Sequence, residues 1–192
     1  MSPSNFDGNT IETAAYLAAI DLSEQDWYNR DNKHGFIGAI MIEQVFDENE
    51  QRQIARHILE GLTDWFGIPE ARESYIEKSA GQLFFAAIED STPIGFLYLK
   101  ETGKDTVELY VMGVSKEYHR HGVGRALFEA AKASALKSGY SFIQVKTVQM
   151  GKYEEYDRTN QFYISMGFKE FEVFPTLWDE WNPCQIYVMA LR

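Results

Sequence analysis

The chain has 192 residues, of which 45% are hydrophobic and 15% aromatic, so it is long enough to bury one sizeable core. Its formal net charge of −11 argues against general nucleic-acid binding, in which a basic face supplies most of the affinity. No apolar run approaches the roughly 20 residues of a membrane-spanning helix, and the single Cys184 excludes an internal disulfide. We therefore expect a cytoplasmic protein with one main domain.

The first 37 residues are polar, acidic and weakly patterned, and we separate them as an extension, 1–37, from the main domain, 38–192. A short helix is expected at 11–20. No basic residue precedes its apolar patch, so the segment does not resemble a signal peptide. We expect the extension to dock on the main domain or on a partner.

The rest of the chain alternates between strand and helix patterns. In chain order these are a strand at 40–46, helices at 48–66 and 69–79, strands at 83–88, 94–99 and 106–114, a helix at 122–138, a strand at 142–148, a helix at 156–166, and strands at 168–174 and 185–191. Short turns make the middle three strands antiparallel neighbours. The order predicts a mixed α/β sheet with helices on both faces.

Between strand 106–114 and the next helix lie Gly122 and Gly124. Glycines leave the free N–H groups of the first helical turn accessible, and the helix dipole favours an anion there. Residues 116–137 hold five basic and two acidic side chains in an otherwise acidic chain. The side chains that could add contacts to a bound phosphate are His119, Arg120, His121 and Arg125. An ordinary solvated helix face would explain the same charges.

The glycine turn does not match the better-known phosphate motifs. No Gly-Lys-Ser/Thr follows, as a P-loop requires, and Ala126-Leu127 stands where the dinucleotide fingerprint needs its third glycine. The sequence His119-Arg120-His121-Gly122-Val123-Gly124 instead resembles the pyrophosphate signature Q/R-x-x-G-x-G/A of the GNAT N-acetyltransferases. His119 stands where that pattern prefers Gln or Arg.

A second stretch supports this resemblance. Asn160-Gln161-Phe162-Tyr163 and the following Gly167-Phe168 are similar to another recurrent segment of the family. The resemblance covers about residues 40–191. It implies a single GNAT-like α/β domain, whose mixed, largely antiparallel central sheet splays apart between strands four and five, with helices on both faces.

The resemblance also implies an acetyl-CoA site in the gap between those strands. The pantetheine arm would pair with the backbone of strand 106–114, and the pyrophosphate would rest on amides 120–125. The residues expected to bind acetyl-CoA are Met112, Gly113, Val114, His119, Arg120, His121, Gly122, Val123, Gly124, Arg125 and Asn160. Gly113 fits because a glycine inside a strand is typical of a bulge or of close backbone approach. Asn160 could equally cap its helix.

Two residues are expected to move protons. In the family a tyrosine of the second segment commonly protonates the departing thiolate, and Tyr163 occupies that position, although it could be a buried core residue. Glu108 lies where several members carry the general base. Strand alternation would place it on one face with Tyr110 and Met112, so that it looks along the cleft and could act through a water. A solvated carboxylate is the alternative, and many members have no single essential base.

The amide of Met112 or Val114 could hydrogen-bond the carbonyl oxygen as it gains negative charge. We expect no metal site, because the four histidines have neither helical pairing nor ligand-loop carboxylates beside them. Cys184 has no nearby histidine in sequence, which disfavours a nucleophilic role.

The resemblance implies an N-acetyltransferase that moves acetyl from acetyl-CoA to a primary amine, of a small molecule or a peptide, by direct attack in a ternary complex. A non-catalytic acyl-CoA-binding or regulatory module on the same fold is the alternative. The acidic, aromatic segments 153–157 and 178–181 could attract a cationic acceptor, or could be solvated charges and packed tryptophans. We expect no nucleic-acid or membrane partner. Exposed sheet edges are compatible with a homodimer.

Overall fold

Strands and helices follow one another in the order that the sequence predicts. The computed structural model describes residues 40–191, so the extension and its predicted helix at 11–20 lie outside the described residues. The elements are β1 Met41–Val45, α3 Glu48–Glu60, α4 Pro69–Lys78, β2 Leu83–Glu89, β3 Thr92–Gly103, β4 Thr106–Val114, a 3-10 turn Lys116–Tyr118, α5 Val123–Lys137, β5 Phe142–Val148, α6 Glu154–Ser165, β6 Lys169–Phe174 and β7 Cys184–Ala190. None of these described helices is long and apolar enough to cross a membrane.

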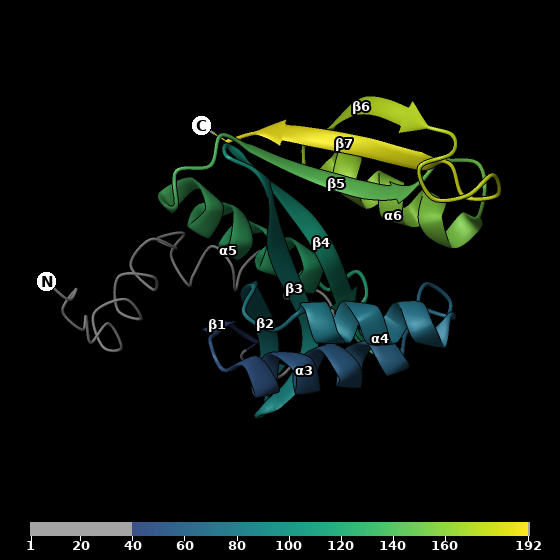
Figure 1. Cartoon of the computed structure of the whole chain (residues 1–192). Coiled ribbons are helices and arrows are strands. Elements are labelled where there is room, and N and C mark those ends of the chain that lie inside the picture. Colours follow the sequence, from purple (N-terminus) through teal and green to yellow (C-terminus); the bar gives the residue numbers. More distant parts are fainter. Residues whose placement is uncertain (1–39, 192) are drawn as a thin grey trace, which may run out of the picture. The chain divides into compact units, whose positions relative to one another are not determined.

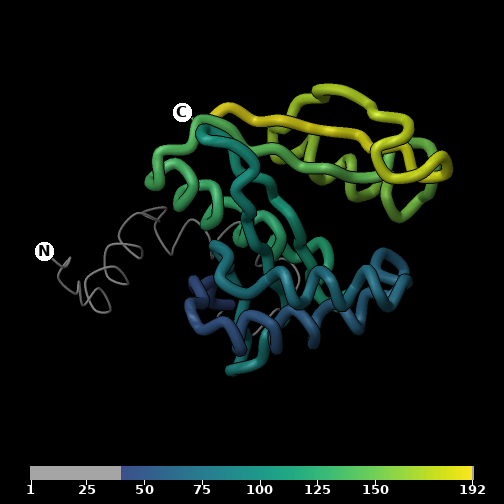
Figure 2. Tube along the Cα trace, in the orientation of Figure 1, coloured from purple at the N-terminus to yellow at the C-terminus, as the bar shows by residue number. Residues whose placement is uncertain are grey.

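The seven strands form one mixed sheet in the order β1-β2-β3-β4-β5-β7-β6. Only β4 and β5 are parallel, and they pair solely over residues 106–109 and 142–145 of the described chain. Further along, β4 stays with β3 and β5 stays with β7. The two strands therefore diverge in a V, which Figure 1 and Figure 2 show between the teal and green segments. The predicted splay between strands four and five is confirmed.

Different helices cover the two faces of the sheet (Figure 1). α3 and α4 pack on one face, which we call the α3 face, and α5 and α6 pack on the other, the α5 face. Phe84, Phe96 and Tyr98 stack across β2 and β3 beneath α3, with ring centroids 5.3 and 6.2 Å from Phe84. Buried aromatic rings of this kind contribute a large part of the hydrophobic stabilisation of a small core.

Helix α3 is shorter than its hydrophobic spacing predicts. Asp47 caps its start, since the side chain accepts from the amides of Asn49 and Glu50. The helix ends at Glu60 instead of continuing to residue 66. After Gly61 the chain closes into a turn, in which the amides of Trp65 and Phe66 both donate to the Leu62 carbonyl. Apolar side chains keep a helical spacing here although the backbone is no longer a regular helix.

A β-bulge at Tyr110 changes which side chains share a face. Tyr98 of β3 pairs with Val111 and Leu99 pairs with Leu109, so Tyr110 is an extra residue on β4. Such an insertion interrupts strict alternation. The sequence-based expectation that Glu108, Tyr110 and Met112 share one face is therefore wrong.

The contacts on either side of the bulge show this directly. Tyr110 meets Tyr75 of α4 on the α3 face, with ring centroids 6.0 Å apart. The Met112 side chain instead reaches Gly124 of α5 on the opposite face. Glu108 and Tyr110 thus belong to the α3 face, and Met112 belongs to the α5 face.

Gly113 is required by the close approach of α3. A Cβ at this position would lie 2.9 Å from Cγ2 of Ile58 and 3.0 Å from Cδ1 of Leu62. No register shift falls between residues 111 and 114, so this strand glycine marks close packing and not a bulge.

We expect Gly113→Ala to lower the free energy of unfolding by about 1–2 kcal/mol, because both neighbours are buried and must move to admit the methyl group. Gly103→Ala is a matched control, since a Cβ there meets no described atom within 4 Å. Urea unfolding of the two variants measures the difference. Equal stabilities would contradict the packing explanation.

Candidate functional site

The opened edge of β4 presents backbone groups to the gap. Ser115 N donates to Ile94 O at 2.9 Å, which marks a hydrogen-bonded pair of the β3–β4 ladder. Because hydrogen-bonded and non-hydrogen-bonded pairs alternate, the polar backbone groups of Gly113 face β3. Those of Met112 and Val114 face away from β3, into the gap. Within this segment, Met112 and Val114 are thus the residues that can pair with a ligand in the gap.

His119 lies at the far end of this edge. Its Nε2 is 2.7 Å from the Val114 carbonyl oxygen, and since a carbonyl only accepts, Nε2 is the donor. The imidazole also meets the Trp65 ring edge-on, with centroids 5.8 Å apart. His119 therefore connects the end of β4 to the loop between α3 and α4. Its predicted contact with a phosphate stays a prediction.

The N-terminus of α5, which we call the cradle, has free amides of the kind that an anion would need. Gly122 precedes the helix with φ +83°, a left-handed conformation that favours glycine, and Arg120 has φ +66°. Among residues 40–191 no side chain caps this helix. The first-turn N–H groups therefore remain available, as a bound phosphate would need.

Gly124 brings this cradle close to the β4 edge. A Cβ on Gly124 would lie 2.8 Å from Cε of Met112. The side chains of Arg120 and Arg125 are exposed beside the cradle. A row of backbone amides, two exposed arginines and an open strand edge thus belong to one region, which suits a long ligand with a phosphate end.

Glu108 and Lys146 form an ion pair where β4 and β5 separate. Glu108 is only 5% exposed, so the alternative interpretation of this residue as a solvated carboxylate is wrong. Lys146 follows the last β5 residue that pairs with β4, and its Nζ donates to Glu108 Oε2. Sequence reasoning missed Lys146. The sequence did contain a clue to Lys146. It lies on strand 142–148, two residues after Gln144, which pairs with Glu108, and residues two apart on a strand share a face.

Tyr163 is buried between α6 and the sheet. Its ring lies 5.9 Å from that of Phe168 and 6.4 Å from that of Tyr187. Burial raises the pKa of the Tyr163 hydroxyl well above its ordinary value, and the nearby Tyr156 adds a smaller increase. The hydroxyl is therefore protonated at neutral pH, as a proton donor must be. The same burial is compatible with a core tyrosine.

A cluster of tyrosines that sequence reasoning did not anticipate lies beside Glu108 on the α3 face. Tyr98 Oη donates to the Tyr75 carbonyl at 2.9 Å, and the Tyr110 ring lies 5.7 Å from that of Tyr98. Lys100 Nζ sits 4.6 Å from the centroid of Tyr110. The cluster depends on the bulge, which has no clear sequence pattern.

Helix α6 is hydrogen-bonded to the end of β5 and to the loop between α3 and α4. Asn160 is fully buried, and its Nδ2 donates to Val148 O at the end of β5 and to Tyr156 O. Tyr156 Oη donates to Trp65 O in the α3–α4 loop at 3.1 Å. Asn160 does not cap α6, which Tyr153 precedes. Its contact with a CoA arm stays a prediction.

The loop between β6 and β7 displays its tryptophans. The Asp179 carboxylate accepts from the amides of Trp181 and Asn182, and hydrogen bonds from Asn182 lower its pKa. Trp178 and Trp181 are 46% and 79% exposed, so they are not packed beneath the hairpin as the alternative held. Asp179 therefore shapes the loop.

Two further candidates offer little chemistry. Cys184 is buried, and burial raises the pKa of its thiol to about 11, so the thiol is neutral at physiological pH. Within residues 40–191 no group of three metal-binding side chains lies together.

The opened sheet and the uncapped, glycine-led helix α5 can now be compared with known proteins. Residues 80–170 match the family model described as "Acetyltransferase (GNAT) domain". This match covers a little under half of the chain, so these residues are similar to that family, and the fold agrees with the likeness.

One curated relative and two solved structures illustrate the likeness. Mycothiol acetyltransferase of Jonesia denitrificans is 36% identical over 87 residues, which are 44% of this chain and only 26% of that protein. A GNAT-family structure from Desulfovibrio desulfuricans has a TM-score of 0.70 at 19% identity, over 80% of this chain and all of the other. An aminoglycoside 6′-N-acetyltransferase complexed with coenzyme A has a TM-score of 0.62 at 14% identity, over 79% and 97% of the two chains. At these identities the solved structures support the fold.

Proposed function

We propose that this chain transfers an acetyl group from acetyl-CoA to a primary amine by direct attack in a ternary complex. The observation that carries the proposal is the open β4 edge lying directly beside the uncapped start of α5. A structural neighbour with this fold is an N-acetyltransferase complexed with coenzyme A, which supports the same use here.

Acetyl-CoA fits these residues as the donor substrate. The amides of residues 122–125, with Arg120 and Arg125, would hold its pyrophosphate. The gap-facing backbone groups of Met112 and Val114 would hold the pantetheine arm as an added strand does. The donor then approaches from the α5 face, on which Met112 and α5 lie, and the amine approaches from the α3 face.

The chain's own groups can complete the transfer. The bond from the amine nitrogen to the acetyl carbon forms, and the bond from that carbon to sulfur breaks. An amide of Met112 or Val114 would stabilise charge on the acetyl oxygen. Glu108, which accepts a hydrogen bond from Lys146, would accept the amine proton, directly or through a water, and Tyr163 would protonate the sulfur.

Donor binding can be tested separately from turnover. We expect saturating acetyl-CoA to raise the melting temperature by several degrees, since a ligand at about 100 times its Kd adds roughly 2.7 kcal/mol. Arg125→Gln should weaken binding about tenfold, the order of one charge-assisted hydrogen bond. Lys137→Gln is the matched control, because it removes one positive charge from the other end of α5.

Turnover is measured as release of free CoA thiol with a broad panel of primary amines. Acetyl-CoA binding with no transfer to any amine would reject the transferase and favour a non-catalytic CoA-binding module. No thermal shift would reject both.

A further inference from the structure

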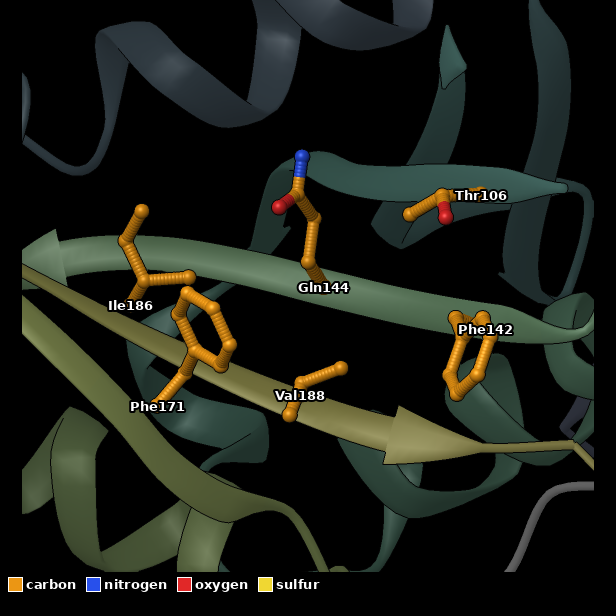
Figure 3. Close-up of a pocket in the computed structure, with 6 residues that line it drawn as sticks. All are labelled: Thr106, Phe142, Gln144, Phe171, Ile186 and Val188. Atoms are coloured by element: carbon orange, nitrogen blue, oxygen red, sulfur yellow. The ribbon is translucent and has the colours of Figure 1, made fainter. Parts of the chain in front are cut away.

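The α3 face carries a hollow that is lined by strand residues and by no described helix. It lies over β4, β5, β6 and β7, and its volume is about 340 Å³. We call it the apolar hollow. Its lining side chains are those of Thr106, Phe142, Gln144, Phe171, Ile186 and Val188 (Figure 3). This volume lies within the range of about 300–1,000 Å³ that small-molecule sites usually have.

A second bulge aims one of these side chains into the hollow. Glu170 pairs with Tyr187 and Glu172 pairs with Ile186, which leaves Phe171 as an extra residue on β6. Figure 3 shows the Phe171 ring beside Ile186 at one end of the hollow and Phe142 at the other. Phe171 is 65% exposed and Phe142 is 43% exposed. Two large apolar side chains left in solvent around one concavity are typical of a binding surface.

Two residues that line the hollow are strand neighbours of the Glu108–Lys146 pair. Gln144, which lines it, is the direct β5 partner of Glu108, and Ile186, which also lines it, is the direct β7 partner of Lys146. Val188 of β7 pairs with Gln144 of β5. The middle of the hollow therefore lies two interstrand spacings, roughly 10 Å, from Glu108.

We propose that the apolar hollow binds the apolar arm of the acceptor, so that the substrate is a primary amine with an aromatic or branched aliphatic group several bonds from its nitrogen. This inference rests on the proposed function for the role of Glu108. The amine nitrogen would sit at Glu108, in place of the Lys146 ammonium. The arm would run along the α3 face, where the lining offers hydrophobic contacts and Gln144 offers one amide.

The test compares 4-phenylbutylamine with butylamine, which differ only in the phenyl ring. With the full chain, we expect KM for 4-phenylbutylamine to be about tenfold lower, the order that partial burial of one ring gives. Phe171→Ser should remove this difference. Phe46→Ser is the matched control, because Phe46 is also 65% exposed and lies after β1, outside the hollow.

A binding measurement separates this inference from the proposed function. Saturation-transfer NMR should detect the phenyl protons of 4-phenylbutylamine on the wild-type chain and on Phe46→Ser, and much less on Phe171→Ser. Such binding without turnover of any amine would support the hollow and reject the transferase. Equal binding by all three proteins would overturn the inference. So would a change from dimer to monomer in Phe171→Ser with unaltered ligand binding, which would make the hollow an interface between copies.

Discussion

Replacing Tyr163 by phenylalanine is expected to lower kcat at least 100-fold, the usual contribution of a positioned general acid. The substitution removes only the hydroxyl. The ring, which packs against Phe168 and Tyr187, stays in place. Binding of acetyl-CoA, measured by thermal shift, should therefore change little, and the loss should appear in kcat and not in affinity.

Tyr187→Phe is the matched control. Tyr187 is fully buried beside Tyr163, and its hydroxyl has no hydrogen-bond partner among the residues described. Removing that hydroxyl should leave the rate unchanged. Equal rates for Tyr163→Phe and the wild type would show that Tyr163 is a core residue and not the acid.

The pH profile gives an independent check. Burial raises the pKa of Tyr163 above its ordinary value of 10.0. The hydroxyl therefore keeps its proton throughout the neutral range. It stops being a proton donor only at a pH above 10.0. The rate should show no alkaline loss due to Tyr163 at pH 8–9.

Replacing Lys146 by methionine is expected to destabilise the protein by about 3 kcal/mol, because it leaves a buried carboxylate without its cation. Glu108 is 5% exposed, whereas the Lys146 side chain is 25% exposed. The reverse substitution, Glu108→Gln, should cost less, since Lys146 can turn its ammonium toward water.

Urea unfolding of the two single variants and of Glu108→Gln/Lys146→Met measures this asymmetry. We expect the double variant to be more stable than Lys146→Met alone, because the neutral amide no longer needs a counter-ion. A double variant that loses the sum of both single effects would mean that the two side chains do not interact.

Much of the fold could be predicted because its local patterns agree with its tertiary structure. The bounds of β4 and β5 follow from apolar runs between clear turns, and Gly122 marks the start of α5. The end of α3 was missed because Leu62, Trp65 and Phe66 continue a helical spacing through an irregular turn. The spacing of apolar residues indicates which side chains are buried. It does not show whether the backbone between them is a regular helix.

The site was harder to predict than the fold. The glycines and arginines of the phosphate cradle are local, so a motif reveals them. Lys146 and Tyr75 belong to other elements and meet Glu108 and Tyr110 only after the sheet has formed. The bulge at Tyr110 depends on the register between β3 and β4, and register has no signature within one strand.

The extra residue at Tyr110 also separates two sets of positions along β4. Before it, Glu108 points to the side from which an acceptor would come, and after it, Met112 and Val114 point to the side of α5. Substitutions at 108 or 110 then change the α3 face of β4 and leave in place the Met112 side chain that contacts α5. One inserted residue therefore lets nearby positions of a single strand belong to opposite faces of the sheet, where each can change without the other.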